Sequence, residues 1–562
     1  MTPSTAANLV LAGGRVFDGT GSPPVAASVA VRDGCIVAVG DHDDVADLIG
    51  PGTEVVDVTG GLVTPGFHDA HVHPVYAGVK LVQCDLSGVL DQSAALAAVA
   101  AYAGAHPDRS WILGGGWSMA TFPGGTPTKE LLDAVVPDRP VFLPNRDGHG
   151  AWVNSVALGL AGVTRDTADP ADGRIERDAT GEPSGTLHEG AMSLVSELVP
   201  RPDAADYDRA IDAAQAYLFS LGITGWQDAI VGDVNGRADN LEAYLRAERD
   251  GRLRARVVGA LWWDRHRGAE QVDELLDRRA AAPRRPGARF AATSVKIMQD
   301  GIAENFTAAM TQPYLDDCGC VTDNSGISFV EPRALQDYVT RLDAEGFQVH
   351  FHALGDRAVR EGLDAIEAAR RANGMNDLRH HLAHLQVVHP DDVPRFAHLG
   401  ALANMQPLWA CHEPQMDELT IPFLGGSLAS WQYPFGDLAR AGATLVGGSD
   451  WSVSSPDVMW GVHVAVNRVS PPAEWADDGI SEDPSVFLPE QRLTLAQALA
   501  AYTSGSAFAN HLDDVVGTVS VGKAADLVVL DRDPFVGAPG EIASTRVRRT
   551  YLDGEAVHRT DD

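Results

Sequence analysis

The stretch TPGFHDAHVHP, from Thr64 to Pro74, contains three histidines and one aspartate directly after apolar and glycine residues. In a β-strand, side chains two residues apart point to the same face. His71 and His73 therefore share a face with Asp69, a candidate to orient them, whereas His68 lies on the opposite face and is expected to be structural. The stretch is either one half of a metal site at the end of a buried strand or a histidine-rich turn, and partners elsewhere in the chain decide which.

The segments that follow alternate between β-type apolar runs and helical patterns, as in a parallel sheet covered by helices. Eight segments fit the strands: LVTPGFHDAHVH, GITGWQDA, RARVVGALWW, ATSVKIMQDG, FQVHFHALGD, RHHLAHLQ, GALANMQP and GATLVGGSD. Eight such units predict an α/β fold, a (β/α)8 TIM barrel, although periodicity by itself does not distinguish a barrel from an open doubly wound sheet.

Both ends of the chain differ in character from the middle. Short β-type segments separated by glycine and Asp-Gly turns fill them. They predict a small β-sandwich-like domain built from residues 1–63 and 510–562, attached to a barrel domain of residues 64–509. The first two barrel strands are too far apart for one crossover, so residues 79–221 are expected to contain a large insertion.

The overall charge limits the kinds of partner. Asp and Glu outnumber Lys and Arg by 77 to 43, which gives a net charge of −34. Such a charge repels polyanions, so neither nucleic acid nor a membrane is expected as a partner. No apolar run is long enough to span a bilayer and the first residues lack a secretory pattern, so a cytoplasmic location is expected. Five scattered cysteines do not suggest a disulfide framework.

Metal-type side chains fall at the ends of several predicted strands. The carboxyl ends of barrel strands converge on one mouth, so side chains at these ends are brought together. They are His71 and His73, Lys296 at the end of TSVK, His350 and His352 in FQVHFH, His384 in HHLAH, and Asp450 in GGSD. Ligands that converge from separate rigid strands predict a site for a catalytic divalent ion.

These motifs, in this order, resemble those of the amidohydrolase superfamily of metal-dependent hydrolases. PGFHDAHVHP resembles its His-x-His signature, VKIMQDG its strand-four lysine, HFHALGD and HLAH its single-histidine strands, GGSD its strand-eight aspartate, and GTVSVGKAADLVVLD its terminal β domain. The segments DGHGAWVNSVAL, GRIERDATGEPSGTLHEGA and RFAHLGALANMQP resemble the large-insertion branch that includes N-substituted formamide deformylases.

The resemblance implies a role for each of these side chains. It makes His71 and His73 ligands of a buried metal ion, Lys296 a carbamylated bridging ligand, His352 and His384 ligands of a second ion, and Asp450 the residue beside the hydroxide. One or two divalent ions are then expected, with Zn²⁺ as the first choice. Asp450 would be the catalytic acid and base, taking a proton from the attacking water and giving one to the departing nitrogen.

Two alternatives stay open at the metal site. An unmodified Lys296 would leave a single ion held by His71, His73 and Asp450. His350 faces the same way as His352 and is a second candidate, either as ligand or as pocket residue, although the HALGD context favours His352.

Aromatic and histidine side chains in predicted loops or in the insertion are candidates for the substrate pocket. They are Trp117, His149, Trp152, His350, Trp409 and Trp451. Such a set predicts a small-molecule substrate that is apolar or aromatic, although each tryptophan fits packing in a core equally well.

The predicted function is hydrolysis of an amide-type C–N bond other than a peptide bond, as in an N-substituted formamide or an N-acyl compound. One alternative keeps the metal site but cleaves a carbamate, an ester or a lactone. Another is a catalytically silent binding or scaffold protein. A homodimer is expected only because symmetric dimers are the commonest oligomers.

Overall fold

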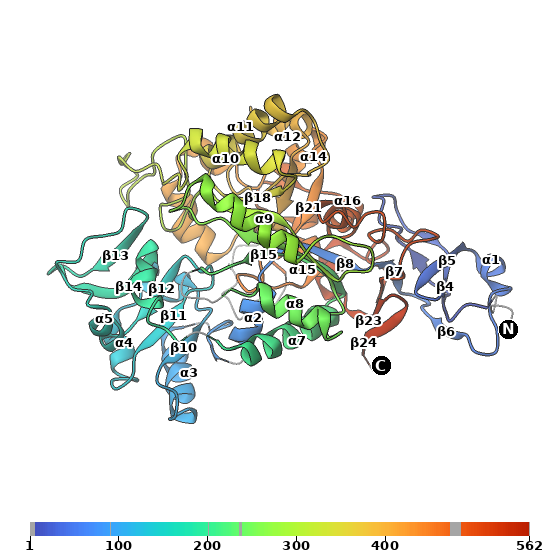
Figure 1. Cartoon of the computed structure of the whole chain (residues 1–562), viewed down its shortest axis with the longest axis horizontal. Coiled ribbons are helices and arrows are strands. Elements are labelled where there is room, and N and C mark those ends of the chain that lie inside the picture. Colours follow the sequence, from blue (N-terminus) through green and yellow to red (C-terminus); the bar gives the residue numbers. More distant parts are fainter. Residues whose placement is uncertain are drawn as a thin grey trace.

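The computed structural model of the chain describes residues 6–560 except 82, 90, 201, 235–238 and 472–484. Its central body is a (β/α)8 barrel, which confirms the predicted fold class. Two β-rich parts extend from the barrel at opposite ends of the molecule (Figure 1). One contains the N-terminal strands and the other is the insertion that follows the first barrel strand.

The barrel sheet has eight parallel strands in the spatial order β21-β20-β19-β18-β17-β16-β15-β8. They are β8 (Phe67–Val72), β15 (Ile223–Val231), β16 (Arg256–Trp262), β17 (Phe290–Met298), β18 (Gln348–Ala353), β19 (His381–His384), β20 (Leu402–Met405) and β21 (Leu445–Gly447). Each strand overlaps one of the eight segments expected from the sequence, although β15 and β17 extend two residues beyond theirs. The first and last are joined just beyond their ends, where the Asp450 N–H donates to the His71 carbonyl and the His73 N–H to the Trp451 carbonyl, both at 2.7 Å.

Helices cover the outside of this sheet. The helices between and after the barrel strands include α2 (Pro74–Lys80), α7 (Ala204–Ser220), α8 (Leu241–Arg249), α9 (Val272–Ala281), α10 (Pro332–Ala344), α11 (Asp356–Asn373), α12 (Val393–Leu399), α14 (Phe435–Arg440) and α15 (Val458–Asn467). In α11, the fully buried Val359, Leu363 and Ile366 recur at the spacing of one helical face, and this helix packs against β18.

Two further sheets contain strands from the ends of the chain. Their orders are β5-β4-β1-β6 and β24-β23-β22-β7-β2-β3. The strands are β1 (Leu9–Ala12), β2 (Arg15–Val16), β3 (Val25–Ala26), β4 (Ser28–Arg32), β5 (Cys35–Gly40), β6 (Glu54–Asp57), β7 (Leu62–Pro65), β22 (Leu527–Leu530), β23 (Val547–Leu552) and β24 (Glu555–Arg559). Strand β7 pairs with β2 on one side and with β22 on the other, so both ends of the chain contribute to one sheet. Leu11, Val29 and Val529 belong to an apolar core that the two sheets share.

Gly66 separates β7 from β8, which the sequence suggested as one strand. A Cβ atom at Gly66 would lie 2.3 Å from Thr224 Oγ1, so the close approach to β15 requires glycine. The chain therefore passes directly from the terminal sheet into the barrel at this corner, and His71 follows it by five residues.

The insertion between α2 and α7 has its own six-stranded sheet in the order β13-β14-β12-β11-β10-β9. Its elements are β9 (Cys84–Asp85), α3 (Gln92–Ala105), β10 (Ile112–Gly115), α4 (Lys129–Asp133), β11 (Val141–Pro144), β12 (Gly150–Val153), α5 (Ser155–Ala161), β13 (Gly173–Arg177) and β14 (Pro183–Glu189). The predicted range 79–221 also takes in α7, which packs against α8 and β15 of the barrel.

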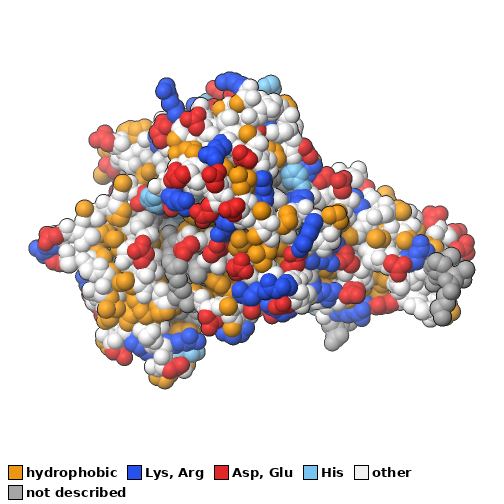
Figure 2. Space-filling model, viewed as in Figure 1, with side chains coloured by type: hydrophobic (Ala, Val, Ile, Leu, Met, Phe, Trp, Pro, Cys, Tyr) orange, Lys and Arg blue, Asp and Glu red, His pale blue; other side chains and the backbone are white. Residues whose placement is uncertain are grey.

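The described acidic side chains are not gathered in one patch on the face shown in Figure 2. On the face shown in Figure 2, Asp and Glu side chains are interspersed with Lys and Arg side chains over the barrel and both extensions. Among the helices that the structure describes, none is long and apolar enough to cross a membrane.

Candidate metal centre

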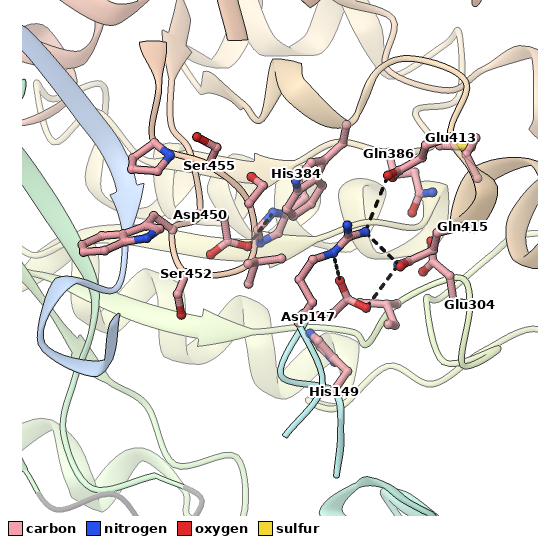
Figure 3. Close-up of a pocket in the computed structure, with 18 of the residues that line it drawn as sticks. Asp147, His149, Glu304, His384, Gln386, Glu413, Gln415, Asp450, Ser452 and Ser455 are labelled. Atoms are coloured by element: carbon pink, nitrogen blue, oxygen red, sulfur yellow. Dashed lines mark hydrogen bonds and ion pairs between the residues drawn. The ribbon is translucent and has the colours of Figure 1, made fainter. Parts of the chain in front are cut away.

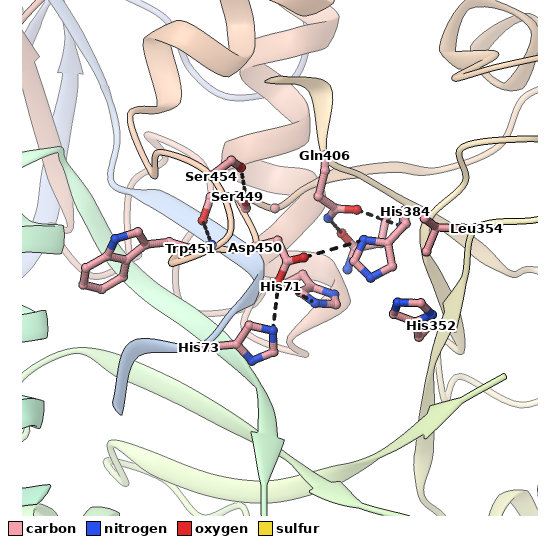
Figure 4. A network of polar contacts seen from close by, with 12 residues as sticks. His71, His73, His352, Leu354, His384, Gln406, Ser449, Asp450, Trp451 and Ser454 are labelled. Atoms are coloured by element: carbon pink, nitrogen blue, oxygen red, sulfur yellow. Dashed lines mark hydrogen bonds and ion pairs between the residues drawn. The ribbon is translucent and has the colours of Figure 1, made fainter. Parts of the chain in front are cut away.

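Three of the predicted ligands meet at the barrel mouth (Figure 4). His71 lies in β8, His73 follows that strand directly, and Asp450 follows β21. The Oδ1 atom of Asp450 lies 3.2 Å from His71 Nε2 and 2.8 Å from His73 Nε2. The possible ligand atoms of these residues all lie within 4.8 Å of one another, which is the spacing that one metal ion requires.

The other predicted ligands line the same cavity. His352 in β18 and His384 at the end of β19 have ring centroids 4.5 Å apart, and His384 Nδ1 lies 3.9 Å from Asp450 Oδ2. Lys296 in β17 lines the cavity with them. Three buried atoms at this place have no hydrogen-bond partner among the described residues. They are the two ring nitrogens of His384 and the Nζ of Lys296. Buried polar atoms normally have a partner, so these three indicate a group that binds there.

The proton positions at His71 follow from a chain of buried hydrogen bonds that begins at the backbone. The Nε2 of Gln348 donates to the carbonyl oxygens of Arg379 and Ala509, at 2.8 and 2.7 Å. The Gln348 Oε1 must therefore be the atom that accepts from Gln227 Nε2 at 3.0 Å. Gln227 Nε2 also donates to Asn510 at 3.1 Å, so the free lone pairs of Gln227 are those of its Oε1.

Two histidines donate to that Gln227 oxygen. His350 Nδ1 lies 2.6 Å from it and His381 Nε2 lies 3.0 Å from it. Burial holds the pKa of His350 well below its ordinary value, with a contribution from Lys296, so the ring is neutral and its Nε2 has no proton. The Nε2 of His350 must accept from His71 Nδ1, 2.8 Å away. His71 therefore carries its proton on Nδ1.

This assignment leaves a lone pair on His71 Nε2 that faces the Asp450 carboxylate at 3.2 Å. Burial, with a contribution from Lys296, lowers the pKa of His71 to about 3, so the ring is neutral near pH 7. A lone pair and a carboxylate oxygen repel each other at that distance unless a cation lies between them. The donor set thus fits a divalent metal ion, with His71 Nε2 and Asp450 Oδ1 as two of its ligands.

The same hydrogen-bond chain reaches the backbone of His384. Asn404 Nδ2 lies 3.0 Å from His381 Nδ1, Gln406 Nε2 donates to Asn404 Oδ1 at 3.1 Å, and the His384 N–H donates to Gln406 Oε1 at 2.8 Å. The His384 backbone has a φ of 82°, a conformation that side-chain-bearing residues rarely adopt. The Gln406 side chain therefore holds His384 in this unusual conformation beside the site.

Two carboxylates orient the neighbouring parts of the site. Asp300 accepts hydrogen bonds from the N–H groups of Leu354 and Gly355, and its Oδ1 lies 3.2 Å from His352 Nδ1. A carboxylate on one ring nitrogen leaves the other available to a metal. Asp69, which the sequence suggested as an orienting residue, accepts from the His71 N–H at 3.0 Å and so acts through the backbone.

The sequence did not point to Gln227, Gln348 or Asp300. Gln227 and Gln348 are fully or almost fully buried in strands, and Asp300 lies two residues after the end of β17. A polar residue at a buried strand position was the available signal, because such a residue must find a partner in the interior.

Three residues expected in the substrate pocket lie elsewhere. Trp117 and Trp152 are buried in the core of the insertion, where their Nε1 atoms donate to the carbonyls of Leu143 and Thr128. They are large apolar side chains in a folded unit with its own core, so the expectation that they contact substrate was wrong. His350 lies beneath the mouth, bonded to His71 and Gln227, and does not line the cavity.

The remaining pocket candidates do line the cavity, which has two chambers. One has a volume of about 370 Å³ and includes Trp409 and Trp451 in its wall. The other has a volume of about 650 Å³ and lies between the barrel and the insertion. His149, His352, His384 and Asp450 line both, so the chambers meet at the candidate metal centre. Trp409 stacks on His384 with a centroid distance of 5.3 Å.

His149 brings an imidazole ring, paired with Glu189, from the insertion to this junction. Burial opposes the charged ring, but the Glu189 carboxylate, with both oxygens 3.0 Å from His149 Nδ1, outweighs it and raises the pKa of His149. The insertion thereby supplies a hydrogen-bond donor above the barrel mouth.

Comparison with known proteins agrees with this geometry. The sequence profile of the amidohydrolase family matches residues 54–558. The chain belongs to the amidohydrolase family. Family membership and the fold together assign the barrel mouth as the place where a metal-dependent hydrolase has its site.

Relatives within the amidohydrolase family align over nearly the whole chain. Protein LONG AFTER FAR-RED 3 of Arabidopsis thaliana is 30% identical over 98% of this chain and 92% of its own length. The N-substituted formamide deformylase of Arthrobacter pascens is 28% identical over 94% of each chain. A solved structure, an uncharacterized metal-dependent hydrolase from Pyrococcus furiosus, has a TM-score of 0.69 and 26% identity, covering 94% of this chain and 99% of its own.

Proposed function

We propose that the chain hydrolyses an amide-type C–N bond other than a peptide bond in a small organic molecule, such as an N-substituted formamide or an N-acyl compound. The observation that carries the proposal is the lone pair of His71 Nε2 facing the Asp450 carboxylate in a cavity large enough for such a molecule. The similarity to an N-substituted formamide deformylase over most of the chain supports the choice of an amide.

The proposed metal ligands are His71, His73 and Asp450 for one ion, with His352 and His384 for a second, and Zn²⁺ is the ion we expect. A divalent ion at this place supplies an activated water at neutral pH and polarises a carbonyl oxygen. Carbamylation of Lys296 would add a bridging carboxylate. Burial lowers the pKa of Lys296 to about 7, so a good part of the amine is uncharged and able to take up carbon dioxide.

Asp450 is proposed as the residue that moves the proton. Although burial opposes it, the His73 ring, with its Nε2 2.8 Å from Asp450 Oδ1, lowers the pKa of Asp450, so the carboxylate is ionised and ready to accept a proton from the attacking water. The same carboxyl group then donates this proton to the departing nitrogen. His149, whose charged form Glu189 favours, lines the chamber and is proposed to donate a hydrogen bond to the carbonyl oxygen of the substrate.

The apolar or aromatic body of the substrate is proposed to pack against Trp409 and Trp451. Both side chains line the smaller chamber, and Trp409 stacks on His384, so an apolar group bound there lies next to the metal centre.

Hydrolysis of matched aromatic formamides and esters by the zinc-loaded protein tests the proposal. We expect the amide to be cleaved, the activity to disappear with a chelator, and Asp450→Asn to lower kcat by about 10²–10⁴-fold. Asp178→Asn, which changes a carboxylate on an exposed turn, serves as the control and leaves kcat unchanged. Cleavage of the ester alone would contradict the amide assignment, and a protein that binds no metal would contradict both.

The state of Lys296 has a separate readout. Intact mass under native conditions should show one added carbon dioxide, and Lys296→Met should remove both this mass and one of two bound metal ions. An unmodified lysine with one bound ion would support the mononuclear alternative.

A further inference from the structure

The smaller chamber ends in a polar wall that the hydrolytic chemistry does not use. Figure 3 shows Glu304, Gln386, Glu413 and Gln415 grouped on the side of the chamber away from Asp450 and Ser452. This group, together with Arg146 and Asp147, is called the acceptor wall below.

The acceptor wall contains more carboxyl groups than guanidinium groups. Its one guanidinium, Arg146, has Nε 3.7 Å from Asp147 Oδ1 and Nη2 3.6 Å from Glu413 Oε2, and it donates to Gln415 Oε1 at 3.0 Å. The third carboxylate, Glu304, accepts from Thr420 Oγ1 at 2.8 Å. The wall therefore has three carboxyl groups and one guanidinium, and the guanidinium is already engaged by Asp147, Glu413 and Gln415. Burial and the neighbouring Asp147 raise the pKa of Glu304, so its charged form is unfavourable there without a further cation.

Gln386 gives an independent indication of a ligand. Its side chain is 1% exposed and lines the chamber. Its Nε2 lies 3.4 Å from Gln432 Oε1, and the Gln432 Nε2 in turn donates to the Ala429 carbonyl, which fixes both amides. The Gln386 Oε1 is then buried without a hydrogen-bond partner among the residues that the structure describes. A buried acceptor left unpaired is destabilising, and a donor entering the chamber would satisfy it.

We propose that the acceptor wall binds a cationic nitrogen group of the substrate, a protonated amine or an amidinium, at the end opposite to the bond that is cleaved. The inference rests on the proposed hydrolysis and specifies its substrate class. The N–H groups of such a cation find acceptors in Gln386, Glu304 and Asp147, while Trp409, which stacks on His384, packs against the apolar body beside the candidate metal centre. The substrate is thus amphipathic, with a hydrolysable amide at one end and a positive charge at the other.

The test compares three N-benzylformamides that differ only in the para substituent: aminomethyl, methyl and carboxymethyl. With the zinc-loaded protein, we expect kcat/KM to fall in the order cation, neutral, anion, with at least about a tenfold step between cation and neutral. Glu304→Gln should reduce the ratio of cation to neutral by about tenfold. Glu182→Gln, which removes a carboxylate from an exposed pair with Arg165 on the insertion, should leave this ratio unchanged.

The outcomes separate this inference from the proposed function. Hydrolysis with equal or higher kcat/KM for the methyl compound would overturn the cationic site while leaving amide hydrolysis in place. If no formamide is hydrolysed, calorimetric titration of the zinc-loaded protein with the same compounds measures their binding affinities and tests the acceptor wall directly. Tighter binding of the aminomethyl compound, weakened by Glu304→Gln, supports the acceptor wall, and equal or weaker binding overturns it.

Discussion

His71 owes the position of its proton to residues far away in the sequence. The backbone carbonyls of Arg379 and Ala509 fix Gln348, which fixes Gln227, which in turn fixes His350. Each step is one hydrogen bond between buried groups, so the order of donors and acceptors cannot be reversed without leaving an unpaired atom. The barrel interior thereby keeps His71 Nε2 unprotonated and directed at the candidate metal centre.

His350 is therefore expected to be a positioning residue for the metal. His350→Ala should weaken Zn²⁺ affinity by about 10–100-fold, because His71 Nδ1 loses its acceptor. His350→Gln, whose amide oxygen can accept that hydrogen bond, should recover much of the affinity. Zn²⁺ affinity is measured by competition with a chromophoric chelator, and urea unfolding of the metal-free proteins shows how far each variant is destabilised. Equal affinities for both variants would contradict the positioning role.

The candidate ligands could be predicted from the sequence, whereas the residues that orient them could not. His71, Lys296 and Asp450 stand at strand ends, and the common direction of barrel strands is enough to bring them to one mouth. The contact between Gln227 and Gln348 depends on the register of strands 121 residues apart. No pattern within either strand predicts how the two strands are aligned, so this contact could not be predicted from the sequence.

At the scale of elements, the last turn of α10 is tied to the start of β19 by one buried carboxylate. Asp343 accepts hydrogen bonds from Asn373, from Asn376 and from His380 Nε2, the last at 2.8 Å. His380 Nδ1 accepts from the Val349 N–H of β18. Burial alone would raise the pKa of Asp343, but these hydrogen bonds outweigh it and lower the pKa to about 2.

This contact should make stability depend on pH in acid. A carboxyl group with a pKa of about 2 in the folded protein and about 3.9 when unfolded stabilises the fold fully above about pH 5 and loses this effect between about pH 4 and pH 2. The difference in unfolding free energy between the wild type and Asp343→Asn should therefore narrow by about 1 kcal/mol as the pH falls from 6 to 3. Urea unfolding at a series of pH values measures it, and a constant difference would contradict the contribution of Asp343.

The positions of the strands were easier to predict from the sequence than the surroundings of the side chains that they carry. The period of apolar residues located all eight barrel strands, but it could not tell whether a tryptophan beside a strand faces a cavity or a core. Trp152 lies in β12 of the insertion with a fully buried side chain. Its partners, such as Phe122 at a centroid distance of 5.0 Å, become neighbours only when the insertion folds as a unit.

At the scale of the whole molecule, one arginine joins the barrel to the terminal sheets. Arg256 at the start of β16 donates from Nε to Asp526 Oδ2 at 2.7 Å and from Nη2 to Asp526 Oδ1 at 3.1 Å, and it also reaches Asp553 at 2.5 Å. The Asp526 side chain is 1% exposed. Removal of one partner from such a pair leaves an uncompensated buried charge.

Arg256→Met should therefore lower the unfolding free energy by about 3–5 kcal/mol. Arg254→Met is the matched control, because Arg254 and its partner Glu555 are 40% and 77% exposed and an exposed pair contributes at most about 1 kcal/mol. Calorimetric unfolding compares the two variants, and limited proteolysis of Arg256→Met should cut first at the terminal sheets. Equal melting temperatures for both variants would contradict the role of Arg256.

The pairing of β7 with both β2 and β22 also means that its sheet cannot be completed until late in synthesis. Strands β1 to β7 leave the ribosome early, but β22 follows β7 by roughly 460 residues, which takes about half a minute to a minute and a half at about 5–20 residues per second. During that time one edge of β7 has no native neighbour, and an open strand edge is a template for pairing with other chains. The nascent protein therefore needs protection at its beginning until its last strands have been made.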